Sequence, residues 1–121
     1  MIKSLAHMLL GAMFITGGAN VLREPGGRVQ RVEKVGIPKP REATILNATI
    51  MVIAGSALAL DIAPKLAALT LIGSLIPTTW VGHRFWEERD PVTRAGQQTQ
   101  FFKNLAMLGG LLLVLVEKDD A

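Results

Sequence analysis

The chain of 121 residues contains no cysteine, no tyrosine and only two histidines. Without cysteine, this chain forms no disulfide, binds no metal through thiolates and uses no thiol as a nucleophile. Two histidines and no dense cluster of carboxylates also argue against an intrinsic metal centre. Because tyrosine is absent, tryptophan and phenylalanine must supply any aromatic rings at a membrane surface.

Charged residues are missing from four stretches of the sequence, residues 5–22, 43–60, 66–83 and 104–116. A helix of a soluble domain carries charges along its outer face, whereas a helix of about 20 apolar residues crosses the hydrocarbon core of a bilayer. A soluble bundle of very apolar helices is the alternative. We predict an all-α fold, an integral membrane four-helix bundle in one domain over residues 1–121, with helices at about 5–22, 43–60, 65–85 and 100–116.

The last of these helices has the weakest length argument, because its charge-free stretch is the shortest. Phe101 and Phe102 stand at its start, followed by Lys103 and Asn104. We predict that the two rings lie at headgroup depth and that Lys103 extends its ammonium group to lipid phosphates. Asn104 caps the first turn or bonds a neighbouring helix. The preceding stretch ERDPVTRAGQQTQ is polar and is predicted as a loop, with an earlier helix start in the headgroup layer as the alternative.

Small and amide side chains indicate where the helices meet. Gly11 and Gly18 are seven residues apart and therefore share one helical face. Glycine lets membrane helices approach closely, and amides bond across them. We expect Asn47 to bond Asn20, which lies at a similar depth. The predicted helix-packing residues are Gly11, Gly18, Asn47, Gly109 and Gly110.

The first connection has an amphipathic pattern. Valine recurs at every third position, with cations between them, and Pro25 and Pro38 bound the segment. This pattern predicts a short helix at about residues 28–36 that lies in the membrane interface, valines towards the lipid tails. A solvated loop is the alternative.

The cations are distributed unevenly between the two ends of the predicted helices. Ten of the 13 Lys and Arg residues fall in the first and third connections. The positive-inside rule therefore places these connections in the cytoplasm and both termini outside. Because the basic residues track the membrane flanks, they do not indicate nucleic-acid binding. The predicted contacts to lipid headgroups or an acidic partner are Arg28, Arg31, Lys34, Arg84, Arg89, Arg94 and Lys103.

Polar residues at membrane depth are candidates for chemistry. His7, near the outer end of the first helix, is predicted to be interfacial. His83 lies between Trp80 and Trp86, and its imidazole exchanges a proton near neutral pH. A quinone headgroup needs a hydrogen-bond partner and a stacking surface, so His83, Trp86 and Asn20 form the candidate quinone site. An interfacial histidine in contact with headgroups and water is the alternative.

The first helix contains the segment LLGAMFITGGANVL and the last contains FFKNLAMLGGLLLV. Both segments resemble the DoxX family of small bacterial membrane proteins. The resemblance implies four transmembrane helices and a link to membrane redox chemistry, since some relatives are subunits of a thiosulfate:quinone oxidoreductase. The matching positions look architectural: Gly11, Phe14, Gly18, Lys103, Asn104, Gly109 and Gly110.

Three functions follow as hypotheses. The first is an accessory or anchor subunit of a redox-linked or other envelope complex in the bacterial inner membrane, with no prosthetic group of its own. Its partners would be lipids and other membrane or membrane-associated proteins. The second is a quinone-reactive oxidoreductase subunit. The third is a small transporter or channel, which requires a homo-oligomer because one chain offers no hydrophilic path.

Overall fold

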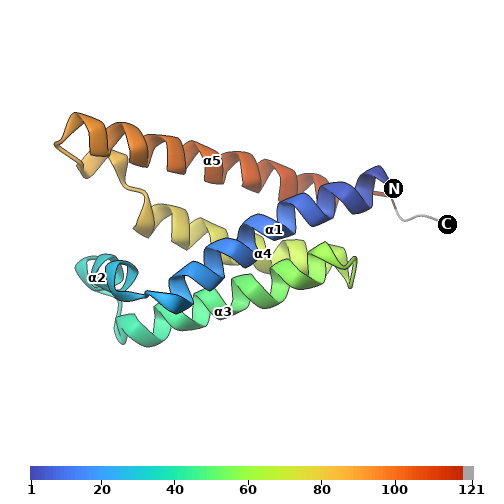
Figure 1. Ribbon diagram of the computed structural model, residues 1–121, viewed down its shortest axis with the longest axis horizontal. Helices are drawn as coiled ribbons and strands as arrows, with labels where there is room; N and C mark the ends of the chain where they lie inside the picture. Colours follow the sequence, from blue (N-terminus) through green and yellow to red (C-terminus); the bar gives the residue numbers. More distant parts are fainter. Residues whose placement is uncertain (119–121) are drawn as a thin grey trace.

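The computed structural model describes residues 1–118, which form helices and connections without a β-strand. The long helices are α1, α3, α4 and α5, and Figure 1 shows the start of α1 and the end of α5 at one end of the molecule and α2 at the other. The helices are α1 (Ile2–Arg23), α2 (Gly26–Lys34), α3 (Pro40–Ala59), α4 (Pro64–Gly82), the short 3-10 helix η1 (Phe85–Glu87) and α5 (Pro91–Leu115). The all-helical prediction is therefore confirmed.

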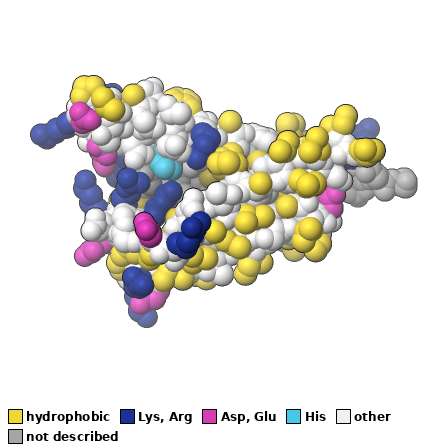
Figure 2. Space-filling view, viewed as in Figure 1, with side chains coloured by type: hydrophobic (Ala, Val, Ile, Leu, Met, Phe, Trp, Pro, Cys, Tyr) yellow, Lys and Arg dark blue, Asp and Glu magenta, His cyan; other side chains and the backbone are white. Residues whose placement is uncertain are grey.

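The outer surface of the helices is apolar along most of its length. Large side chains such as Leu9, Ile53 and Leu66 are about two-thirds exposed, at 65%, 66% and 66%. Hydrophobic side chains also cover much of the face seen in Figure 2. Within residues 1–118, three helices are long and apolar enough to cross a membrane: α1, α3 and α4 with its extension to Glu87. An exposed apolar surface of this extent fits lipid and not water.

The last helix begins earlier than predicted. α5 starts at Pro91, nine residues before the predicted start at about residue 100. The carboxylate of Asp90 accepts hydrogen bonds from the backbone N–H of Thr93 at 3.0 Å and from its hydroxyl at 2.8 Å. An aspartate at the N-cap followed by proline at the first helical position strongly favours a helix start. The prediction of a polar loop is therefore wrong from Pro91 onwards, and the helix starts earlier, as the alternative had it.

α1 and α3 pack backbone against backbone. A Cβ atom at Gly11 would lie 2.5 Å from the carbonyl oxygen of Gly55, and one at Gly18 would lie 2.7 Å from that of Ala48. Both distances are far inside van der Waals contact, so only glycine fits at these two positions. The helical face that Gly11 and Gly18 were predicted to share is the face of α1 that packs against α3.

The two glycines predicted to pack α5 behave differently. No atom of another described helix lies within 4 Å of where a Cβ would stand on Gly109, which is exposed. Gly110 faces Leu10 at an ordinary 3.5 Å. Gly109 is therefore not a packing residue within this chain, because it lies on the outer face of α5.

Asn47 joins α3 to α4 and not to α1. Its amide nitrogen donates to the hydroxyl of Thr78 at 2.7 Å, and its amide oxygen accepts from the hydroxyl of Ser74 at 2.7 Å. Asn20 is exposed and accepts from Arg23 at 3.1 Å. The expected bond between Asn20 and Asn47 does not form, because the two amides point to different neighbours although their depth is similar.

Substitution at Gly11 tests the contact between α1 and α3. Gly11→Val is expected to lower the free energy of unfolding by about 1–3 kcal/mol, the usual cost of overpacking. Reversible unfolding in detergent micelles would measure it. Gly73→Val is the matched control, because no other described helix lies within 4 Å of a Cβ there. Equal losses in the two variants would contradict the assignment.

Candidate functional site

A cavity of about 350 Å³ opens between the helices at the end where α2 lies. All five α-helices contribute to its wall, which is mainly apolar. In Figure 2, Lys and Arg side chains surround a hollow at this end, and a histidine is visible inside it. The polar residues that line the cavity include Arg28, Asn47, Thr78, His83, Lys103 and Asn104. This combination of an apolar wall and a few polar groups is typical of a ligand site.

His83 follows α4 directly and is 7% exposed. Its Nδ1 lies 2.8 Å from the amide oxygen of Gln97 on α5. Within residues 1–118, no side chain bonds its Nε2. Because an amide presents either its oxygen or its NH2 group, the pair can hold the imidazole with Nε2 as an acceptor or as a donor. His83 can therefore bond either a hydroxyl or a carbonyl group of a ligand.

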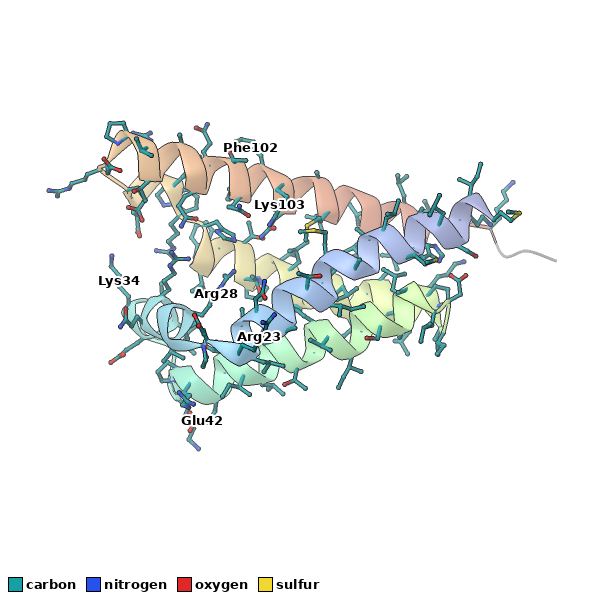
Figure 3. The ribbon with its side chains drawn as sticks, in the orientation of Figure 1. Arg23, Arg28, Lys34, Glu42, Phe102 and Lys103 are labelled. Atoms are coloured by element: carbon teal, nitrogen blue, oxygen red, sulfur yellow. The ribbon has the colours of Figure 1, made fainter. Side chains whose placement is uncertain are left out.

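Two cations of the cavity have no carboxylate partner in the described part of the chain. Figure 3 shows Arg28 reaching from α2 and Lys103 from α5. Lys103 donates to the amide oxygen of Gln100 at 2.6 Å, and neither cation forms an ion pair with a described residue. Burial and the positive charge of Arg31 lower the pKa of Arg28. The cavity is therefore positively charged without compensation.

The other polar side chains of the cavity already form bonds within or between helices. Asn104 is 4% exposed, and its amide nitrogen donates to the hydroxyl of Thr79 at 2.9 Å. That hydroxyl donates to the carbonyl of Leu75 at 2.8 Å. Of the two roles predicted for Asn104, a cap of the first turn or a bond to a neighbouring helix, the structure shows the second. His83, Arg28 and Lys103 remain as the groups available to a ligand.

Two residues of the predicted quinone site do not line this cavity. Trp86 is 41% exposed and packs against Trp80, Phe85 and Phe101, with ring centroids 5.4–5.7 Å apart. Asn20 bonds Arg23 outside the cavity. The structure therefore separates His83 from the two partners proposed for it. Gln97 is the neighbour that sequence reasoning missed, because its segment was taken for a loop.

Three of the five remaining predicted cations lie together in a second group. Arg31, Lys34 and Arg84 line a neighbouring cavity of about 340 Å³ together with Glu87 and Glu88. Arg84 pairs with Glu87 at 3.0 Å and lies 5.0 Å from the ring centre of Trp80. Arg89 and Arg94 are exposed. This second cavity contains two acids as well as three bases, so its excess of positive charge is smaller than that of the first.

His7 forms a polar cluster at the opposite end of the molecule. It is 3% exposed, its Nδ1 bonds the carboxylate of Asp61, and its Nε2 lies 2.9 Å from the carboxylate of Glu117. Ser4 donates to Asp61 at 2.7 Å. The cluster joins α1, the turn between α3 and α4, and the end of α5. The prediction of an interfacial role for His7 did not foresee these partners.

The acidic limb of a stability profile tests this cluster. Hydrogen bonds from Ser4 and His7 lower the pKa of Asp61. Its contribution to stability is therefore present above its ordinary pKa of about 3.9 and is lost as the pH falls through the lowered folded value. Asp61→Asn is expected to be less stable than the wild type at pH 7 and to lose less stability below about pH 4.

The measurement is the unfolding temperature in detergent from pH 7 to pH 3. Glu33→Gln is the control, because Glu33 is exposed on α2 at the other end. Superimposable acid profiles for the wild type and Asp61→Asn would contradict the assignment.

Comparison with known proteins adds one match. The DoxX family model matches residues 3–84, which run from α1 to the connection after α4. The matched segment ends before α5, so the resemblance of Phe101–Val114 to the family lies outside it. No curated protein and no solved structure matches the chain. Because the matched segment covers more than half of the 121 residues, the chain belongs to the DoxX family.

Proposed function

We propose that this small DoxX membrane protein is an accessory subunit that anchors a redox-linked complex at the bacterial plasma membrane. The observation that carries the proposal is the projecting first part of α5. Nine of the ten residues from 91 to 100 are exposed, and Val92 is 81% exposed. A short polar helix that buries so little is marginal by itself in water. A partner that packs on it would supply the missing burial.

The proposed topology has four spans. α1, α3, α4 and the apolar part of α5 cross the membrane, with the basic end in the cytoplasm and both termini outside. The apolar part of α5 from Phe101 to Val116 is about 24 Å long, shorter than a core of about 30 Å, so the bilayer thins around it. α2 lies in the interface, with its half-buried Val29 and Val32 inward and its exposed Gln30 and Lys34 towards water.

A quinone-reactive subunit is the second candidate, and the environment of His83 favours it. His83 lines a mainly apolar cavity, no described side chain bonds its Nε2, and the Gln97 amide can fix either tautomer. As a donor, Nε2 would bond a quinone carbonyl, and as an acceptor it would bond a quinol hydroxyl. This chain would bind and orient the headgroup, while the redox partner would exchange electrons with it.

Site-specific photocrosslinking tests the accessory role. A photoreactive residue at Val92 is expected to capture one protein in stoichiometric yield in native membranes. The same residue at Leu66 is the control, because Leu66 is similarly exposed, at 66%, but lies on the apolar part of α4. It is expected to capture lipid. Lipid alone at Val92, or the same protein at both positions, would overturn the docking proposal.

Quinone binding tests the second candidate. A short-tailed quinone should quench the fluorescence of Trp80 and Trp86 in the purified protein. His83→Ala is expected to weaken binding about tenfold, which corresponds to one hydrogen bond of about 1.4 kcal/mol. Asn20→Ala, outside the cavity, should bind like the wild type. An unchanged affinity of His83→Ala would rule out this site.

A further inference from the structure

The basic cavity has an excess of positive charge that the described residues do not neutralise. Arg28 comes from α2, Lys103 from α5 and His83 from the end of α4, so three separate elements bring basic groups to one space. Glu87, an acid at this end of the molecule, pairs with Arg84 and not with Arg28 or Lys103. Like charges held together in a partly dry space are unfavourable unless an anion joins them.

The wall of the cavity is apolar and reaches the outer surface of the protein. Met13 and Val21 of α1, Leu46 and Ile50 of α3 and Met107 of α5 line it. Leu46 is also 62% exposed, so the cavity wall continues into the lipid-facing surface. A ligand that fits this space therefore combines an anionic head with a hydrocarbon chain.

We propose that the cavity binds one anionic phospholipid from the surrounding leaflet. Its phosphate lies between Arg28 and Lys103, and the first part of one acyl chain lies along the wall formed by α1 and α3. The guanidinium fork and the ammonium group both donate to phosphate oxygens, and such charge-assisted bonds are the strong ones. The rest of the lipid stays in the bilayer.

The charge of the ligand separates this proposal from the quinone site. A neutral quinone accepts hydrogen bonds but leaves both positive charges uncompensated, whereas a phosphodiester carries the opposite charge. A free inorganic phosphate would neutralise the cations but would leave the apolar wall empty. Lipid binding in the cavity does not depend on the accessory role of the protein, so either proposal can be refuted without the other.

Lipid retention in native mass spectrometry tests the proposal. The full chain is purified, delipidated in detergent and mixed with phosphatidylglycerol or with phosphatidylcholine of the same acyl chains. The wild type is expected to keep one phosphatidylglycerol at concentrations where it keeps no phosphatidylcholine. Arg28→Gln and Lys103→Gln are each expected to weaken retention at least about tenfold, the effect of losing one charge-assisted hydrogen bond.

The control variants separate the site from general surface charge and from misfolding. Arg23→Gln removes an exposed cation outside the cavity and is expected to retain phosphatidylglycerol like the wild type. Lys103→Arg keeps the charge and should retain the lipid as well. Circular dichroism checks that each variant keeps its helices.

Four outcomes would overturn the proposal. Equal retention of phosphatidylcholine would show that the cavity recognises the acyl chain of the lipid and not the charge of its headgroup. Equal loss in Arg23→Gln would show diffuse attraction. Displacement of the lipid by glycerol phosphate at a similar concentration would show a site for soluble phosphate. Retention of a quinone in place of phosphatidylglycerol would assign the cavity to the quinone.

Discussion

Most of the structure depends on how closely α1 approaches α3. In lipid there is no hydrophobic force between helices, so helices associate through packing and through bonds between polar groups. At Gly11 and Gly18 the backbones of α1 and α3 are so close that a Cβ would collide with a carbonyl oxygen. This contact fixes α1 on α3, and α1 is therefore not available to pack along the whole of α5.

α4 is held to its two neighbours by hydrogen bonds between side chains. Asn104 of α5 bonds Thr79 of α4, and Asn47 of α3 bonds Thr78 of α4. α1 and α5 meet at the end where His7 bonds Glu117, and Figure 1 shows them separating towards the end where α2 lies. The cavity occupies the space that this separation leaves. α2 reaches it with Arg28 and Val32, so the interfacial segment forms part of the wall.

Sequence reasoning predicted the features that depend on one helix at a time. The absence of charge predicted the long helices, and the spacing of Gly11 and Gly18 predicted their shared face. It did not predict which face of α5 meets a neighbour, so Gly109 was assigned a contact that it does not make. Equal depth also did not ensure that Asn20 and Asn47 face each other, because depth says nothing of direction around a helix axis.

The polar sites show the same limit more clearly. His83 was identified from its position between two tryptophans, but its partner Gln97 lay in a segment taken for a loop. Asp90 and Pro91 carried the signal for the true helix start, but the prediction followed the charge-free stretch and took the polar segment before it for a loop. The cluster of His7, Asp61 and Glu117 joins residues that are far apart in the chain. Nothing in their local sequence marks them as neighbours.

The contact between α5 and α1 lies at one end of the molecule, and this has a mechanical consequence. α5 has 25 residues, which corresponds to about 37 Å at 1.5 Å per residue. A change of about 5° in its tilt around the Glu117 end displaces the Asp90 end by about 3 Å, with the rise of an ideal helix. Lys103 and Gln97 travel with it, while Arg28 on α2 does not. A tilt of α5 that widens the cavity would therefore also move the projecting segment, and it would stretch the bonds of Asn104 to Thr79 and of Gln97 to His83.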